Sequence, residues 1–400
     1  MHRPAPLSRR AFIAGAAALP LAGLGAARAL GQTSGTVDVV IVGAGAAGIA
    51  AARRAGAPLY AAPDAARLFV NGREAREGEY EDFVAALRQG ERAIGAAGDA
   101  ARDLPASRVL PDLGPWAQNV GIVLGPATCA KDLDQVSTVD FSRAEPRDAG
   151  VFVRSGLGDF LASLAAPLAV RFDTPATSVD LGPRLVQVAT RRGNVGGRFC
   201  ILAAPPSLIA AGKLRVSPLP TRYRGAVDRI TLGAFDHILF EWPGNPLGVA
   251  DDETLQVKAP DGRAFTLVAR IGGSDLHVVE VGGKLATDLA AGPPQAGASY
   301  LKEALTGAFG ATVAGKVGKV HQTRWTREPY ALGAWSCALP GAGNLRRAFT
   351  EVVNGRLAFA GEHAHETLWG TVHGAWASGE RAAQQAIRAL GGGNAATLAQ

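Results

Sequence analysis

Cysteine is scarce in this 400-residue chain, which has only Cys129, Cys200 and Cys337, all far apart in the sequence. An odd number of widely separated cysteines argues against a disulfide framework, and their spacing is not that of a metal site. The seven histidines show no H-E-x-x-H or similar arrangement. Both observations predict a protein without a bound metal.

Aromatic and charged residues are also few, at 6% and 19% of the chain. The formal net charge is +6, but the basic residues are scattered and form no stripe interleaved with aromatic side chains. This pattern argues against nucleic-acid binding. With 48% hydrophobic residues the composition is that of a soluble globular protein. The length allows for two or three domains of about 150 residues each.

The apolar run near the N-terminus, residues 14–27, is shorter than the ~20 residues that a transmembrane helix needs. It follows S-R-R-A-F-I at residues 8–13, which resembles the twin-arginine export signal, and ends in small residues suited to cleavage. We therefore predict a signal peptide over residues 1–30 and a periplasmic or secreted protein without stable membrane insertion. A retained membrane anchor is the alternative.

A glycine-rich turn follows the first predicted strand. Residues 37–42, Val-Asp-Val-Val-Ile-Val, lead directly into a G-x-G-x-x-G sequence and then into an Ala-rich predicted helix. Such a turn places backbone N–H groups against the pyrophosphate of a dinucleotide. The candidate cofactor-binding residues in it are Gly43, Ala44, Gly45, Ala47 and Gly48. Alone, this loop is a weak signal.

A second pattern near the C-terminus strengthens it. An apolar strand at residues 356–360 runs into Gly361 and Glu362, and a short loop then leads into a helix that opens with small residues from Gly370 onward. The first turn of a helix presents unpaired N–H groups and the positive end of the helix dipole. Phosphate or an electron-rich ring can bind there.

The two patterns together resemble the flavin-containing amine oxidase family, which includes monoamine and polyamine oxidases. The resemblance implies an α/β (α+β overall) fold, with a Rossmann-like FAD-binding domain and a substrate domain that has a mixed or antiparallel sheet and helices. We expect the FAD-binding domain at 36–56, 151–225 and 350–390, the substrate domain at 57–150 and 226–349, and a flexible tail at 391–400.

Coarse secondary structure follows from periodicity. Residues 64–110 show mostly helical spacing, and residues 170–172 read as a short strand. Residues 176–180 and 185–189 read as a strand pair. Two-residue alternation within 228–290 predicts an antiparallel sheet. Residues 295–310 look helical.

On the substrate side, the resemblance gives two catalytic candidates, His237 and Trp335. Family members often place a lysine near the flavin N5, where it holds a water, and His237 occupies that position in a similar strand. Trp335 lies in residues 324–336, which resemble the family segment W-x-x-[DE]-P-Y-x-x-G-[ACS]-[YW]-[ST], where an aromatic wall of the substrate cage stands. The alternatives are structural: His237 as a hydrogen-bonded sheet residue, and Trp335 as ordinary core.

On the cofactor side, the resemblance implies FAD held without a covalent bond, because Ala334 stands where some relatives attach the flavin through cysteine. Thr371 replaces the second aromatic of the cage. The remaining cofactor-binding candidates, which the resemblance places along the FAD from adenine to flavin ring, are Ala176, Gly361, Glu362, Thr371 and Val372.

One part of the family pattern is missing. A second strand ending in Asp or Glu should follow the first helix and hold the adenosine ribose. Here Pro58 and Pro63 interrupt the segment, and only Asp64 lies at a suitable distance. No Gly-Gly-Arg turn follows. We interpret this as an internal deletion between about Arg54 and Gly56.

Three functions stay open at this point. The first is an FAD-dependent oxidoreductase that oxidises a small-molecule amine at the carbon next to nitrogen, with O2 as the expected acceptor and H2O2 as product. The second is a non-catalytic or truncated paralogue with impaired flavin binding. The third is a related FAD-dependent desaturase or amino-acid oxidase. The sequence indicates neither the amine nor the oligomeric state.

Overall fold

The structure, a computed structural model, describes residues 36–43, 45–50, 59–61, 66–145, 151–153 and 156–391. The predicted signal peptide, Ala44, Asp64 and nearly all of the predicted tail lie outside these residues. The described chain contains a six-stranded and a seven-stranded sheet, both covered by helices. This mixed architecture confirms the predicted α/β fold class. No helix in the described ranges is both long and apolar enough to cross a membrane.

The six-stranded sheet is organised around one central strand, β8, which is buried on both faces and therefore reads as an apolar run at residues 199–202. β8 is parallel to β1 on one edge, and on the other edge it is antiparallel to β7 and parallel to β17. In spatial order the strands are β1 (Thr36–Val42), β8 (Gly193–Leu202), β7 (Val186–Thr190), β6 (Ala176–Leu181) and β9 (Arg215–Ser217), with β17 (Leu357–Phe359) beside the end of β8.

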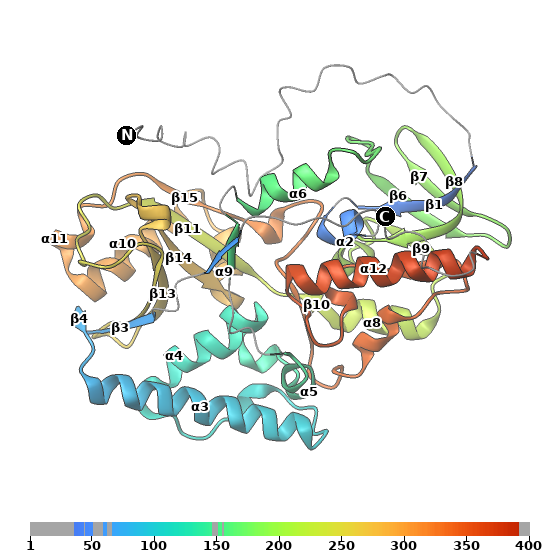
Figure 1. Ribbon diagram of the computed structural model, residues 1–400. Coiled ribbons are helices and arrows are strands. Elements are labelled where there is room, and N and C mark those ends of the chain that lie inside the picture. Colours follow the sequence, from blue (N-terminus) through green and yellow to red (C-terminus); the bar gives the residue numbers. More distant parts are fainter. Residues whose placement is uncertain are drawn as a thin grey trace.

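Helices cover both faces of this sheet, as the right half of Figure 1 shows. On one face, α2 (Ala46–Ala50) and α12 (Val372–Ala389) pack against Phe199 and Ile201 of β8. On the other face, α8 (Thr221–Arg229) packs against alternate residues of the same strand. The arrangement places the start of α2 and the body of α12 side by side.

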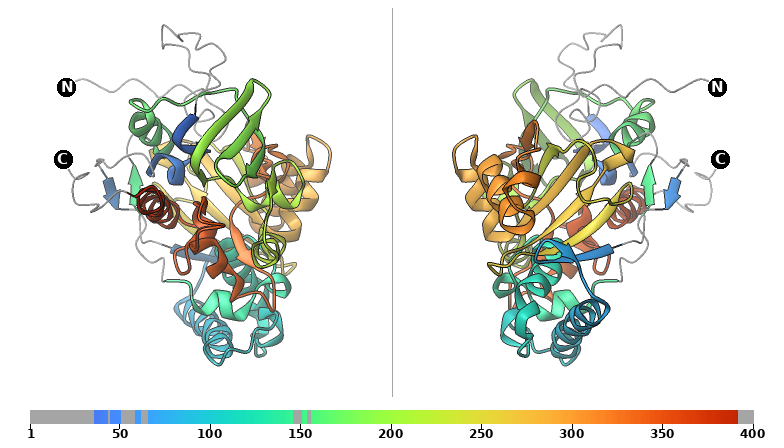
Figure 2. Two further views of the ribbon diagram at one scale, coloured as in Figure 1. Left: turned by 90° about the vertical axis from the view of Figure 1, so that its right-hand side faces the viewer. Right: turned by 90° about the vertical axis from the view of Figure 1, so that its left-hand side faces the viewer.

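The seven-stranded sheet carries the predicted two-residue alternation and is mostly antiparallel. One face packs on α10 (Ala296–Phe309), and the other faces α3 (Glu77–Asp99) and α4 (Ala117–Ile122), as the two views of Figure 2 show. Its strands, in spatial order, are β15 (Val320–Gln322), β11 (Phe235–Glu241), β14 (Leu276–Gly282), β13 (Ala264–Ala269), β12 (Glu253–Lys258), β3 (Ala66–Val70) and β4 (Arg73–Glu74).

Two secondary-structure predictions were wrong. The expected helical stretch at 64–110 contains α3, but β3 and β4 precede it, because β3 pairs in parallel with the distant strand β12. Residues 170–172 form no strand, and Phe172 is 59% exposed. The strand pair at 176–190 and the helix at 295–310 are confirmed as β6, β7 and α10.

The segment after α2 departs from a dinucleotide fold. β2 (Leu59–Ala61) pairs antiparallel with β5 (Val151–Val153) in a separate two-stranded sheet. Within the described residues β1 therefore pairs with β8 alone, and Val37 and Ile41 of β1 stay exposed. The described strands include no second parallel neighbour of β1. The internal deletion stays a prediction that agrees with this geometry.

Candidate functional site

The glycine turn has the backbone geometry that a phosphate cradle needs. Gly43 has φ +103°, and a Cβ there would lie 2.4 Å from the carbonyl oxygen of Ala203. A Cβ on Gly48 would lie 2.1 Å from the carbonyl oxygen of Gly43, so the third glycine lets the helix pack on the turn. Gly45 faces open space. These three environments match the three glycine roles of a dinucleotide loop.

Three neighbouring parallel strands end beside this turn. β1 leads into Gly43, β8 leads into Ala203, and β17 leads into Gly361. Backbone hydrogen bonds join the ends, from Ala203 N to the Val42 carbonyl (2.8 Å) and from Ala360 N to the Leu202 carbonyl (3.0 Å). Ligands of open α/β sheets bind outside the carboxyl ends of their strands. The predicted cofactor segments thus meet at the edge where such a ligand belongs.

The long helix α12 closes the same edge. Thr371 caps it, because its Oγ1 accepts a hydrogen bond from Gly374 N (2.9 Å). The leading N–H groups and the positive dipole end are at Val372, a residue that is 44% exposed. Further along α12, the Ser378 hydroxyl bridges the backbone N and O of Gly361 at 2.8 and 2.9 Å. The helix therefore fixes the turn that follows β17.

Glu362 is an internal hydrogen-bond acceptor. Its Oε1 accepts from Ser336 N (2.9 Å), and its Oε2 accepts from the Ser336 hydroxyl (2.8 Å) and from Gly370 N (2.7 Å). Burial raises the pKa of Glu362, and the nearby Arg346 opposes that rise. We predicted from the sequence that Glu362 is a cofactor-binding residue. The structure shows its carboxylate holding the loop before α12.

A buried ion pair lies next to the turn that contains Glu362. Arg346 and Asp140 are 2% and 1% exposed, and their Nη2 and Oδ2 atoms are 2.6 Å apart. Arg346 Nη1 also donates to the Ser336 hydroxyl (2.9 Å) and to the carbonyl of His363 (3.2 Å). Asp140 Oδ2 accepts from Ala338 N (2.8 Å). The pair thus connects α5 (Thr138–Ser142), β16 (Ser336–Ala338) and the Glu362 turn.

Trp335 joins the start of α12 to the second sheet. A Cβ on Gly370 would lie 2.7 Å from Trp335 Cδ1, so the ring lies against the loop before the helix. Its Nε1 donates to the carbonyl of Thr128 (3.1 Å). The centroid of the ring is 4.8 Å from that of Phe235, on β11. Trp335 is half-buried and contacts both the loop before α12 and the seven-stranded sheet.

His237 continues this row on β11. The centroid of its ring is 5.4 Å from that of Phe235, in an edge arrangement, and its backbone N donates to the Thr323 hydroxyl (2.9 Å). Burial lowers the pKa of His237, so the imidazole is neutral near pH 7. Trp335, Phe235 and His237 thus form a continuous line from the helix α12 onto the sheet. Phe235 was missed from the sequence, although it lies two residues before His237 and so shares its face.

The remaining candidate, Ala176, begins β6 and pairs with Thr190 of β7. It is separated from β8 by β7, away from the glycine turn. The structure therefore brings together the glycine turn, Gly361, Glu362, Thr371 and Val372, and joins them to Trp335 and His237. It does not bring Ala176 into that group.

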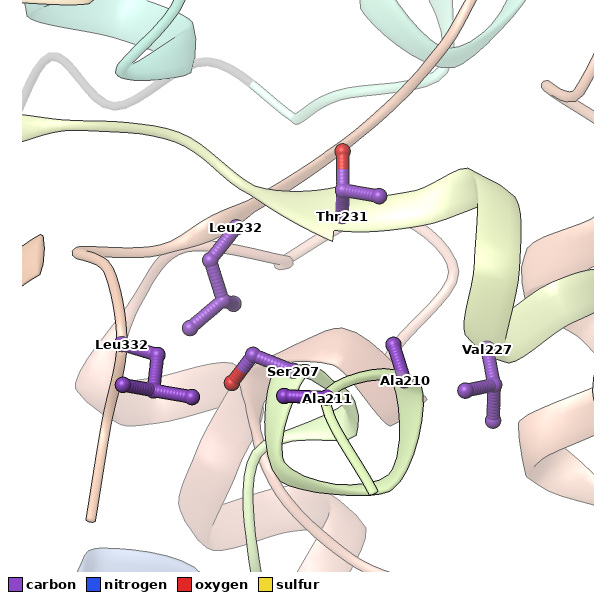
Figure 3. A pocket seen from close by; sticks show the side chains of 7 residues that line it. All are labelled: Ser207, Ala210, Ala211, Val227, Thr231, Leu232 and Leu332. Carbon is purple, nitrogen blue, oxygen red and sulfur yellow. The ribbon is translucent and has the colours of Figure 1, made fainter. Parts of the chain in front are cut away.

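A separate pocket, seen in Figure 3, lies between α7 (Pro206–Ala210), α8 and β10 (Ile230–Leu232). Its only polar side chains, Ser207 and Thr231, are already hydrogen-bonded, to the Ala331 carbonyl and to Lys131. None of the candidate residues lines it. The pocket is therefore distinct from the candidate site.

The comparisons with known proteins cover β8, β17 and the start of α12, and the family model begins after the glycine turn. A family model described as flavin-containing amine oxidoreductase matches residues 119–387. A lysine-specific histone demethylase 1 homolog 3 of Oryza sativa subsp. indica is 27% identical over 267 residues, 63% of this chain and 33% of that protein. Polyamine oxidase 4 of Oryza sativa subsp. japonica is 26% identical over 272 residues, 64% of this chain and 53% of that protein. The chain thus spans about a third to a half of these relatives.

Solved structures share the fold. Cyclohexylamine oxidase from Brevibacterium oxydans IH-35A superposes with a TM-score of 0.71 at 18% identity, covering 89% of this chain and 99% of that one. Putrescine oxidase bound to putrescine gives a TM-score of 0.71 at 15% identity, covering 88% and 99%. At these identities the likeness concerns the fold alone.

Proposed function

Because this chain belongs to the flavin-containing amine oxidoreductase family, we propose that it binds FAD non-covalently and oxidises a small amine at the carbon next to nitrogen. The overall reaction is R-CH2-NH2 + O2 + H2O giving R-CHO + NH3 + H2O2. One observation carries the proposal. The ends of β1, β8 and β17 and the first turn of α12 lie at one edge of the six-stranded sheet. The side chains of Trp335, Phe235 and His237 connect this edge to the seven-stranded sheet.

The residues present fit a dinucleotide at this edge. Gly43 and Gly45 leave the backbone accessible, and a Cβ on Gly43 would strike Ala203. The N-terminus of α12 at Thr371 and Val372 favours negative charge. When bound, the flavin supplies the acceptor for the hydride that leaves the amine carbon. The only cysteine near the family attachment position, Cys337, is fully buried, which supports non-covalent binding.

The substrate side would bind, orient and desolvate the amine. Trp335 and Phe235 offer flat aromatic faces that attract a cationic or neutral amine. The neutral imidazole of His237 does not repel the amine and can accept a hydrogen bond from it or from a water. Excluding water around the amine favours its uncharged form, which is the form that loses hydride.

The test begins with the colour of the purified protein. We expect a flavin absorbance spectrum, and the flavin should appear in the supernatant after acid precipitation. Anaerobic addition of an amine should bleach the spectrum, and O2 should then restore it with one H2O2 per turnover. Full flavin content without bleaching by any amine would refute the function. His237→Ala should slow bleaching more than it lowers flavin content, and equal loss of both would make His237 structural.

A second candidate is a non-catalytic paralogue that holds flavin weakly. It is favoured by the exposed face of β1, which has no second parallel neighbour among the described strands. A colourless preparation that does not take up added FAD would support it. Export through the twin-arginine pathway stays part of the proposal for either function.

A further inference from the structure

A second cavity, of about 570 Å³, adjoins the pocket seen in Figure 3. It lies between β6 and β9 of the six-stranded sheet and the helices α7 and α8. Ala210 and Val227 line both cavities, so the two meet where α7 and α8 contact each other. No candidate cofactor or substrate residue lines either of them. The joined cavity, as we call the two together, is large enough for a small molecule and is separate from the candidate site.

Much of the lining of the joined cavity is apolar. Leu214, Val216 and Leu219, which belong to the buried core under α8, line its wide end. Leu232 and Leu332 line its narrow end, where the hydroxyl groups of the lining are already hydrogen-bonded within the protein. An aliphatic chain gains about fourfold in affinity for each methylene group that it buries on such a surface. The lining therefore favours an aliphatic chain over a polar one.

The polar side chains at the wide end offer two free hydrogen-bond donor groups. Thr177 Oγ1 donates to a backbone carbonyl (3.3 Å), and Ser178 Oγ donates to Asp180 Oδ2 (3.0 Å). Arg215 and Arg224 are exposed, and their guanidinium groups form no hydrogen bond or ion pair with the part of the chain that the structure describes. A ligand group that both arginines recognise is a hydrogen-bond acceptor with negative charge.

One acidic residue among those described on this lining limits the charge of the ligand. Asp228 follows Arg224 by one turn of α8 and is also exposed. Two guanidinium groups and one carboxylate give the lining a net charge of +1. A second negative charge on the ligand would be repelled by Asp228, whereas a single one is balanced. A carboxylate meets this requirement, and its two oxygens can accept paired hydrogen bonds from a guanidinium group.

We propose that the joined cavity binds a monoanionic aliphatic carboxylate. Arg215 and Arg224 hold the carboxylate at the exposed mouth, and the chain lies along the apolar lining towards Leu232 and Leu332. This binding does not depend on the proposed amine oxidation, because the joined cavity shares no residue with the candidate site.

Binding would be measured by isothermal titration calorimetry of the purified protein, with octanoate as the probe. We expect one saturable site per chain with a Kd below about 1 mM. Hexanoate should bind about tenfold more weakly, because it buries two methylene groups fewer. Octan-1-ol, which lacks the charge, and octyl phosphate, which carries nearly two charges, should each bind at least about tenfold more weakly than octanoate.

Single substitutions at the mouth locate the carboxylate. Arg215→Gln and Arg224→Gln should each weaken octanoate binding about threefold to tenfold, a moderate change because both side chains are exposed. Arg108→Gln is the matched control, since Arg108 is also exposed and lies in the turn Ala106–Arg108, outside the lining. It removes the same charge and should leave the Kd for octanoate unchanged.

A further substitution tests whether the chain passes between the two cavities. Ala210→Leu places a larger side chain where they meet, so the preference for octanoate over hexanoate should shrink from about tenfold to about twofold. Because Ala210, Arg215 and Arg224 are exposed, all these variants should fold like the wild type, which circular dichroism checks.

Four results would overturn the proposal. The first is the absence of saturable octanoate binding. The second is octanoate binding that both arginine variants leave unchanged, which would place the ligand elsewhere on the protein. The third is octan-1-ol binding as tightly as octanoate, which would show that charge is not recognised. The fourth is octyl phosphate binding more tightly than octanoate, which would mean that Asp228 does not limit the charge. None of these results bears on the amine oxidase function.

Discussion

Replacing Arg346 by methionine should destabilise the protein far more than the loss of an ordinary ion pair. Asp140 is 1% exposed, and the guanidinium of Arg346 contacts both of its carboxylate oxygens, with Nε–Oδ1 at 2.9 Å and Nη2–Oδ2 at 2.6 Å. Without Arg346 the carboxylate keeps the backbone donor Ala338 N but loses the cation that contacts it. Breaking a buried pair in this way costs about 3–5 kcal/mol.

The assay is urea unfolding of the FAD-loaded protein at fixed FAD concentration, followed by tryptophan fluorescence. Lys284→Met is the matched control, because Lys284 and Asp288 form an exposed i,i+4 pair with an N–O distance of 2.6 Å. Its loss should change the free energy of unfolding by no more than about 0.5 kcal/mol. The double variant of Arg346→Met with Asp140→Asn should recover part of the stability, because no buried charge is left unpaired.

Two results would refute this reasoning. A loss below about 1 kcal/mol in Arg346→Met, or one equal to the Lys284→Met control, would mean that the buried charge finds another partner. A double variant less stable than Arg346→Met would show that hydrogen bonding, and not unpaired charge, dominates. Since Arg346 also donates to Ser336, which donates to Glu362, we expect the single variant to lose flavin as well.

Three further predictions concern other parts of the chain. Burial raises the pKa of Glu280 to about 7, so the free energy of unfolding of the wild type should fall as pH rises from about 4.5 to 7. Glu280→Gln should be more stable than the wild type by up to about 3 kcal/mol at pH 8 and equally stable at pH 4. Stability curves of the two proteins that run parallel with pH would contradict this. Gly379→Ala places a Cβ 2.1 Å from the carbonyl oxygen of Ala47, so flavin absorbance per protein and the unfolding midpoint should both drop, and an unchanged midpoint would show that the helices can separate freely. Changing Arg9 and Arg10 to lysine should keep full-length protein in the cytoplasm. Normal export of this variant in cell fractionation would refute the predicted twin-arginine signal.

Local patterns predicted the parts of the fold that depend on local physics. The glycine turn could be predicted from a strand followed by three glycines and small residues. Gly43 adopts the positive φ expected of a tight turn. The alternation within 228–290 predicted an antiparallel sheet, which the pairing of β11, β14, β13 and β12 confirms. The same alternation puts Phe235 and His237 on one face of the strand β11, but Phe235 was not predicted as a site residue.

Contacts between distant residues could not be predicted in this way. Asp140 and Arg346 are 206 positions apart, and neither lies in a motif that marks it as a partner of the other. The pairing of His237 with Glu280 depends on the register of β11 and β14, which the intervening loop lengths do not reveal. β3 was taken for part of a helix because five residues show too few periods to separate the two structures.

The pairing of β1 connects the predicted deletion with the stability of the proposed cofactor site. Parallel strands are normally covered on both sides, but Val37 and Ile41 are exposed, and β1 pairs with β8 alone among the described strands. Within the described part of the chain, the turn at Gly43 is therefore held by β8 and by the contact of α2 with α12, without a second flanking strand. Any ligand that binds both the turn and the first residues of α12 stabilises the folded state, by an amount that grows with the logarithm of its concentration relative to its Kd. Flavin content and the stability of this edge should accordingly rise and fall together.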